Sequence, residues 1–112
     1  MRPKIIAVDF DDTLFAQKWP GYGEPIWPVI NRVKEEQAAG TCIILWTCRK
    51  GASEAAAVEA CKSVGIVPDY VNENHPIILD EWDGENTRKI FADEYWDDKA
   101  VSVMEVISRD EV

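Results

Sequence analysis

The sequence predicts an α/β fold built on a doubly wound parallel sheet. Short, continuous apolar runs suit strands that are buried on both faces. Apolar residues at helical spacing separate these runs, and acidic or hydroxyl residues follow several of them directly. Alternating strands and helices favour one parallel sheet with right-handed crossovers. The length of 112 residues suits one domain, so residues 1–112 are interpreted as a single domain.

The first half of the chain predicts two strands and a helix. Residues 5–8 are all apolar and form the first expected strand. Residues 15–24 contain Pro and Gly, so we expect a loop or a small flap there. Pro25 opens a helical pattern and Gly40 ends it. Residues 42–46 form the second buried strand.

The second half continues the alternation. Ser53 is expected to cap the next helix and Gly65 to end it. Residues 67–71 form a weaker third strand, and residues 91–96 are interpreted as the last one. The tail at 100–107 is apolar enough to pack against the core, although its pattern does not separate helix from strand.

Composition limits the classes of function. The formal net charge of −9 argues against broad binding to nucleic acid or anionic membranes, while a local cation still admits a small phosphorylated substrate. The three cysteines have no CxxC spacing and suit the reduced thiols of a cytoplasm. No apolar stretch approaches the roughly 20 residues of a membrane span, and the start of the chain is too short for a signal-peptide core. We therefore expect a cytoplasmic protein.

Side chains with useful chemistry gather near the ends of the predicted strands: Asp9 and Asp11 after the first, Thr47 after the second, Lys89 ahead of the last, and Asp97 and Asp98 after it. Such ends converge on one crevice in a doubly wound sheet. Two carboxylates about 4 Å apart repel by roughly 4 kcal/mol at an effective dielectric near 20, so a proton or a metal ion must compensate. Carboxylates with phosphate and water oxygens suit Mg²⁺, whereas a single histidine offers no convincing zinc site.

These motifs resemble those of the haloacid dehalogenase superfamily of aspartate-nucleophile phosphatases, over nearly the whole chain. The family's four motifs are a strand followed by Asp-x-Asp-x-Thr, a strand ending in Thr or Ser, a lysine, and a strand ending in an acidic pair; they match residues 8–13, residues 43–47, Lys89 and residues 95–98. The chain looks like small, capless bacterial and phage-borne members. The resemblance implies a Rossmann-like sheet without a substantial cap domain. Asp12 stands where the family usually has Gly, which puts the fine geometry of that loop in doubt.

The resemblance also implies a reaction, the hydrolysis of phosphomonoesters through an aspartyl-phosphate. Asp9 is expected to attack phosphorus, and Asp11 to protonate the leaving oxygen and then deprotonate the hydrolytic water. Thr47 and Lys89 are expected to hold the phosphoryl oxygens. Arg49 either touches the substrate phosphate or pairs with a surface acid.

The same resemblance implies a Mg²⁺ site. Asp9, the Asp11 carbonyl and Asp97 are expected to bind the ion, with Asp98 supporting the metal shell or the lysine from one layer out. Whether Asp97 or Asp98 is the direct ligand stays open, and Asp93 would replace them if the last strand ended earlier. Arg88, the neighbour of Lys89, is likewise an alternative to it as the cation of the third motif.

Two functions from other classes are alternatives. A phospho-accepting signalling domain similar to a response-regulator receiver is also small, but receivers carry the acidic pair after the first strand, and here it comes late. A catalytically silent metal-binding interaction module is disfavoured by the complete set of nucleophile, acid/base, lysine and metal ligand. The expected partner is a phosphorylated small molecule or the end of a nucleotide or oligonucleotide, and a homo-oligomer that covers the site is compatible with this.

Overall fold

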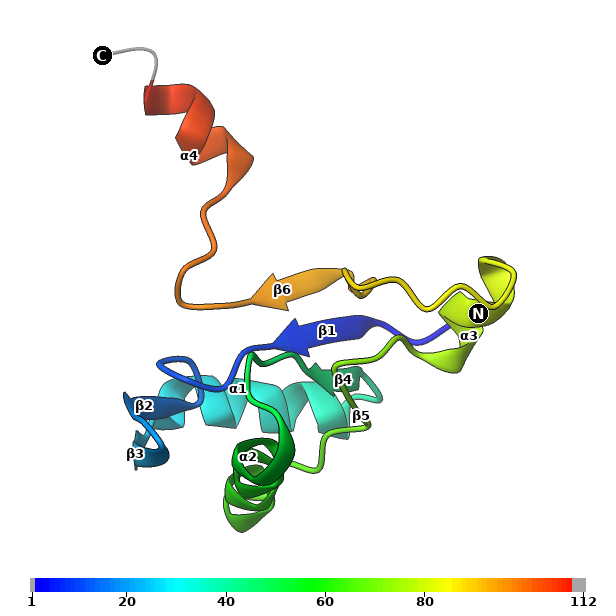
Figure 1. Ribbon diagram of the computed structural model, residues 1–112. Coiled ribbons are helices and arrows are strands. Elements are labelled where there is room, and N and C mark those ends of the chain that lie inside the picture. Colours follow the sequence, from blue (N-terminus) through cyan, green and yellow to red (C-terminus); the bar gives the residue numbers. More distant parts are fainter. Residues whose placement is uncertain (1, 110–112) are drawn as a thin grey trace.

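Figure 1 shows the computed structural model of the protein, which describes residues 2–109. Four parallel strands form its central sheet in the spatial order β5-β4-β1-β6. They are β1 (Ile5–Val8), β4 (Cys42–Leu45), β5 (Tyr70–Val71) and β6 (Glu94–Trp96). Helices lie against the sheet, so the expected α/β class with a parallel sheet is confirmed.

Alternate residues of the strands enter two different cores. Ile6 and Val8 pack with helices α1 (Trp27–Ala38) and α2 (Gly51–Ser63), which lie on the same side of the sheet in Figure 1. Ile5 and Ala7, the intervening residues of β1, belong to the second core together with residues of α3 (Pro76–Glu81). Burial on both faces explains the uninterrupted apolar runs, since each fully buried aliphatic side chain contributes about 1.5–3 kcal/mol.

The strand order brings the functional ends of the strands together. From β1 the chain moves outward through β4 to β5, and it then returns to the other side of β1 for β6. In open α/β sheets a reversal of this kind creates a crevice at the carboxyl ends of the strands. The residues that directly follow β1, β4 and β6 therefore share one edge of the sheet.

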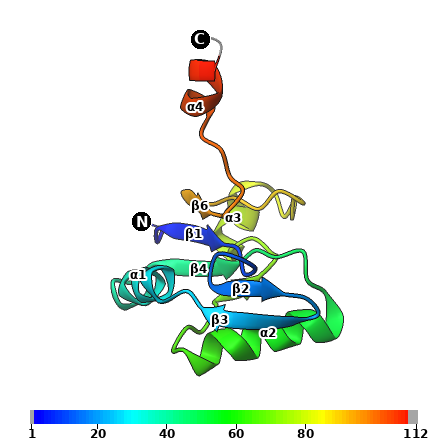
Figure 2. The same cartoon turned by 90° about the vertical axis from the view of Figure 1, so that its left-hand side faces the viewer.

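The segment expected as a loop or small flap is a β-hairpin, seen beside α2 in Figure 2. Strands β2 (Phe15–Lys18) and β3 (Gly21–Pro25) pair antiparallel. Phe15 packs its ring 5.2 Å from that of Phe10 and 5.1 Å from that of Tyr22, so tertiary contacts between aromatic rings hold the hairpin. At Gly23 a Cβ atom would come within 3.1 Å of the Ala16 carbonyl, which explains why this strand contains glycine.

Some element boundaries also differ from those expected. Ser53 lies inside α2, where its hydroxyl donates a hydrogen bond to the carbonyl of Lys50, the N-cap residue. The expected cap at Ser53 is therefore wrong. The strands predicted at 67–71 and 91–96 shorten to β5 and β6. Gly40 and Gly65 end the first two helices with positive φ angles, as expected from a residue without a Cβ atom.

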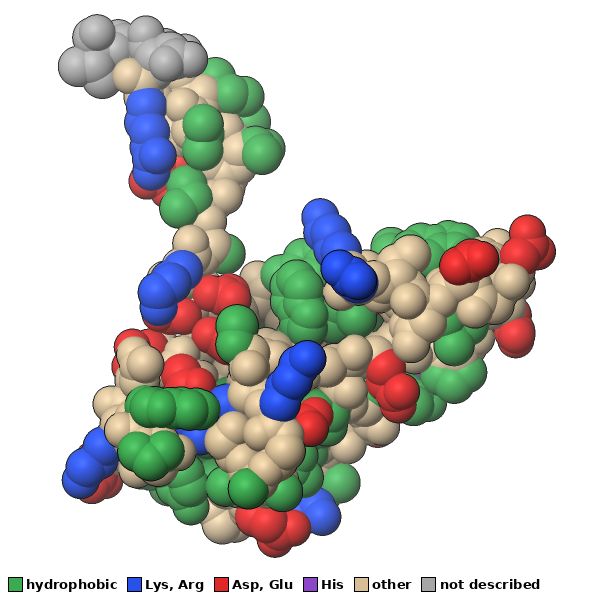
Figure 3. Space-filling model, viewed as in Figure 1, with side chains coloured by type: hydrophobic (Ala, Val, Ile, Leu, Met, Phe, Trp, Pro, Cys, Tyr) green, Lys and Arg blue, Asp and Glu red, His purple; other side chains and the backbone are tan. Residues whose placement is uncertain are grey.

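The C-terminal tail does not pack against the core. It forms α4 (Val103–Ser108), which extends away from the rest of the molecule in both views, and none of its residues is buried. Val103 is 73% exposed, and Figure 3 shows hydrophobic side chains on this segment. The expectation that residues 100–107 pack is therefore wrong. Among residues 2–109, no helix combines the length and the apolar character needed to cross a membrane.

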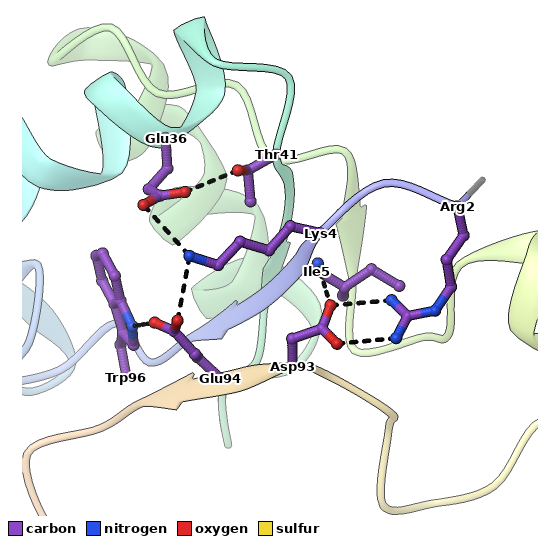
Figure 4. A network of polar contacts seen from close by, with 8 residues as sticks. All are labelled: Arg2, Lys4, Ile5, Glu36, Thr41, Asp93, Glu94 and Trp96. Atoms are coloured by element: carbon purple, nitrogen blue, oxygen red, sulfur yellow. Dashed lines mark hydrogen bonds and ion pairs between the residues drawn. The ribbon is translucent and has the colours of Figure 1, made fainter.

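A polar network ties the start of β1 to the start of β6 (Figure 4). Asp93 accepts hydrogen bonds from the guanidinium of Arg2 at 2.8 and 2.9 Å and from the amide of Ile5 at 2.8 Å. The Arg2 contact, followed by the Ile5 amide, lowers the pKa of Asp93 to about 2. Asp93 precedes β6, so it lies at the amino end of the parallel strands, opposite the residues that follow this strand. This placement removes it as a rival metal ligand.

Candidate functional site

Three carboxylates meet at the carboxyl edge of the sheet. Asp9 follows β1, whereas Asp97 and Asp98 follow β6, and one ligand atom from each lies within 4.8 Å of the other two. The backbone enforces this meeting, because the amide of Asp9 donates a 2.9 Å hydrogen bond to the carbonyl of Trp96. In Figure 3 acidic side chains gather near the base of the C-terminal segment.

The cluster is electrostatically unequal. Burial, with the nearby charges of Asp97 and Asp98, raises the pKa of Asp9 to about 7. A hydrogen bond from Lys99, whose ammonium lies 3.0 Å from the Asp98 carboxylate, holds the pKa of Asp98 below its usual range. Without a cation, Asp9 therefore releases its proton only around neutral pH. Three carboxylates are hard oxygen ligands, a donor set compatible with Mg²⁺.

The turn after β1 has an unusual backbone at the position where the resemblance expects Gly. Asp12 has a φ angle of +59°, in the left-handed region that Asp tolerates better than most residues. Its carboxylate accepts a 2.8 Å hydrogen bond from the amide of Gln17, and its own amide donates to the carbonyl of Phe15 at 2.7 Å. Local hydrogen bonds thus allow Asp to replace Gly in this turn.

Thr47 follows β4 and is held by a residue that sequence reasoning did not single out. Asn72, directly after β5, accepts a hydrogen bond from the Thr47 amide at 2.8 Å and donates one to the Thr47 carbonyl at 2.9 Å. Thr47 lines a pocket of about 250 Å³ together with Asp9 and Asp97. The available signal for Asn72 was its position directly after the third predicted strand, which is the usual place for site residues.

Asp11 is not free at the mouth of this site. Its two carboxylate oxygens accept hydrogen bonds from Nε and one terminal nitrogen of Arg49, at 2.9 and 2.7 Å. The hydrogen bond with Asp11 raises the pKa of Arg49 above its ordinary value. Of the two interpretations left open for Arg49, pairing with an acid is confirmed, but the arginine is buried and its partner is the second aspartate of the first motif.

Lys89 stands apart from the acidic cluster. Its ammonium lies 5.7 Å from the centre of the Tyr95 ring, and this ring packs 5.3 Å from that of Trp46, which lines the Asp9 pocket. Among the described residues that line this pocket, Lys89 is absent. The structure therefore brings Asp9, Thr47 and Asp97 together, whereas Lys89 lies over Tyr95 and does not line their pocket.

Comparison with known proteins gives one informative match. No protein-family model matches the chain, and neither does any curated protein. A solved structure of a conserved protein coded by a locus from Bacteroides thetaiotaomicron is 30% identical, with a TM-score of 0.77, and the match covers 99% of this chain and 94% of that one. The two chains belong to the same family.

The description of the Bacteroides relative names no activity, metal or substrate. Because the match spans nearly all of both chains, the likeness to this relative includes the sheet and the segments that carry the acidic cluster. Membership of this family thus supports the fold, while the chemistry of the site has to be argued from the residues themselves.

Proposed function

We propose that the chain is a Mg²⁺-dependent phosphomonoester hydrolase of the haloacid dehalogenase type, with a Rossmann-like sheet and no substantial cap domain. The observation that carries the proposal is the convergence of Asp9, Thr47 and Asp97 on one pocket from the ends of three different strands. A motif in a sequence leaves open whether its members meet. Here nucleophile, hydroxyl and metal ligand line the same 250 Å³ space.

In the first step of the proposed reaction, a carboxylate oxygen of Asp9 attacks phosphorus. The bond from phosphorus to the leaving oxygen breaks, and Asp11, which enters this step in its protonated form, gives that oxygen its proton. The Thr47 hydroxyl donates to a phosphoryl oxygen, while Asn72 keeps the Thr47 backbone in place through its two hydrogen bonds. Lys89 is proposed to supply a positive charge to the same oxygens.

In the second step, water attacks the phosphorus of the aspartyl-phosphate. Asp11 accepts a proton from this water, the bond to Asp9 breaks, and inorganic phosphate leaves. Both aspartates return to their starting states. Asp9 and Asp11 line a second hollow of about 330 Å³, which gives water and a leaving group room beside the nucleophile.

Mg²⁺ bound by Asp9, the Asp11 carbonyl and Asp97 would offset the negative charge of nucleophile and phosphate, with Asp98 beside it. Burial is the first cause of the raised pKa of Asp9 and the neighbouring carboxylates are the second, and a cation at this place would compensate the charges of these carboxylates. The substrate is proposed to be a phosphorylated small molecule or the end of a nucleotide or oligonucleotide. The open pocket does not select among these.

The test is turnover of p-nitrophenyl phosphate with Mg²⁺ by the wild-type chain, Asp9→Asn and Asp93→Asn. Asp93 is the matched control, an aspartate that precedes β6 and therefore lies at the opposite end of the parallel strands from Asp9. Asp9→Asn should lower kcat by at least about 10³-fold, because the nucleophile is lost. Asp93→Asn should keep activity. Full activity in a folded Asp9→Asn variant would refute the assignment, and a phosphorylated chain that persists for hours would favour the receiver-like alternative.

A further inference from the structure

Arg49 is a buried cation that binds Asp11, one of the residues of the candidate site. It is only 2% exposed, and it lies in the loop between β4 and α2, two residues after Thr47. Its guanidinium carbon lies 5.0 Å from the ring centre of Phe10 and 5.0 Å from that of Trp19. The charge is therefore contacted by two aromatic rings, one of which belongs to the tip of the β2–β3 hairpin.

The hydrogen bonds of Arg49 are all made within the chain. Two of its nitrogens bind the two carboxylate oxygens of Asp11. Its terminal nitrogens also donate to the carbonyls of Pro20 at 3.1 Å and Gly21 at 2.7 Å. Four of the five N–H donors of a guanidinium are thus engaged. The engaged donors and the burial of the side chain favour a structural partner for Arg49 over the substrate phosphate.

We propose that Arg49 is the positioning residue of Asp11 and couples it to the tip of the β2–β3 hairpin, so that one guanidinium sets the leaving-group side of the site. This inference rests on the proposed function, in which Asp11 serves the leaving oxygen. A bidentate fork fixes the plane of a carboxylate as well as its distance. The Asp11 side chain is still 25% exposed, and each of its oxygens has a second lone pair.

The β2–β3 hairpin contacts both Arg49 and the hollow beside Asp11. Gln17 of β2 lines the same 330 Å³ hollow as Asp9 and Asp11, so the hairpin forms part of the wall beside the leaving group. The carbonyls of Pro20 and Gly21 bind the same guanidinium as Asp11. Any displacement of the hairpin tip therefore moves the donors that hold Asp11. Trp19, 62% exposed on that tip, offers its outer surface to solvent at the same place.

Positioning predicts a specific kinetic signature. Displacement of a catalytic group by about 1 Å costs about 10²-fold in rate. Arg49→Met should therefore lower kcat by about 10- to 100-fold and leave KM for p-nitrophenyl phosphate within about twofold. Arg49→Lys keeps the charge but not the fork, so it should lose nearly as much kcat. Lys50→Met, a change at the exposed neighbouring residue, is the matched control and should behave like the wild type.

A double-mutant cycle separates positioning from general structural support. If Arg49 acts through Asp11, Arg49→Met should add little to the loss already caused by Asp11→Asn. If the loss of kcat in the double variant equals the product of the losses in the two single variants, the proposal is overturned. Full activity in Arg49→Lys would also overturn it, as would an effect of Arg49→Met that lies in KM alone, which a phosphate ligand would produce.

A second measurement needs neither catalysis nor a stable Arg49 variant. Asp11→Asn removes the negative charge that binds the Arg49 guanidinium. Amide hydrogen exchange in residues 16–22 should therefore become faster, while exchange in β1 and β4 stays as in the wild type. Unchanged exchange in the hairpin would overturn the coupling. A folded wild-type chain that lacks phosphatase activity would refute the proposed function, and the exchange result would still decide whether Asp11 and the hairpin are coupled.

Discussion

The backbone amide of Asp98 donates a hydrogen bond to the hydroxyl of Thr13, 3.1 Å away. This contact joins the turn after β1 to the segment after β6. Thr13 is buried, so its hydroxyl occupies a fixed position under the acidic cluster. The Thr13 side chain therefore helps to fix the backbone from which one of the three carboxylates extends.

Replacing Thr13 by Val should weaken Mg²⁺ binding. The shape of the side chain is nearly kept, but the Asp98 amide loses its partner, which costs about 1 kcal/mol of unfolding free energy. Loss of a group that orients metal ligands typically costs about 10- to 100-fold in metal affinity. Titration with Mg²⁺ and urea unfolding measure the two effects. Thr13→Ser retains the hydroxyl and serves as the control; wild-type affinity in Thr13→Val would contradict the prediction.

The stability of the metal-free protein should fall as the pH rises from about 4 to about 7. The pKa of Asp9 is about 7 in the folded chain and about 4 in an unfolded one. Between these values the folded state binds a proton that the unfolded state has released, so deprotonation favours unfolding. Thermal unfolding in a chelator, compared with Asp9→Asn, isolates this contribution. Asp9→Asn should lose the slope and Mg²⁺ should flatten it, while identical slopes in both chains would argue against a raised pKa.

Lys89 should matter for turnover and Arg88 should not. The ammonium of Lys89 lies over the Tyr95 ring, and this ring packs against Trp46, which lines the Asp9 pocket. If the ammonium reaches the phosphoryl group, Lys89→Met should lower kcat/KM by about 10²-fold, as expected when one charge-stabilising donor is removed. Arg88→Met is the matched loss of a neighbouring cation. Equal effects of both substitutions on kcat/KM would reject the specific role.

A bulky thiol reagent should inactivate the protein through Cys48. This residue is exposed and lines the pocket with Asp9, whereas Cys42 and Cys61 are buried. Burial raises the pKa of Cys42 to about 11 and that of Cys61 to about 12, which keeps both as unreactive thiols. Mass spectrometry should find a single rapid modification, and Cys48→Ser should remain active after treatment. Loss of activity in treated Cys48→Ser would place the effect elsewhere.

The sheet and the meeting of its acidic ends could be predicted because both depend on local patterns. Apolar runs such as residues 5–8 and 42–45 show which segments are buried on both faces. The rule that parallel strands share an edge then brings Asp9 and Asp97 together. These steps need no knowledge of side-chain packing, and the structure agrees with them.

The contacts around Arg49 could not be predicted in this way. Arg49 and Asp11 are separated by 38 positions, and no periodicity relates them. The hairpin is held by rings from three segments, including Phe10 and Tyr22, so its strands become evident only once the core exists. Val103 illustrates the opposite limit, because an apolar pattern indicates that a segment can pack but not that a surface is available to it.

The hydrogen bond between Asp98 and Thr13 also has a consequence for the synthesis and folding of the chain. The two residues are 85 positions apart, and β6 is the strand of the sheet that comes last in the sequence, paired in parallel with β1. During translation, Asp9 is therefore synthesised long before Asp97 and Asp98. Pairing of such distant strands is a slow, late event in folding. A chain interrupted before β6 would carry Asp9 but lack Asp97 and Asp98, so the proposed metal site could form only after this strand has been made.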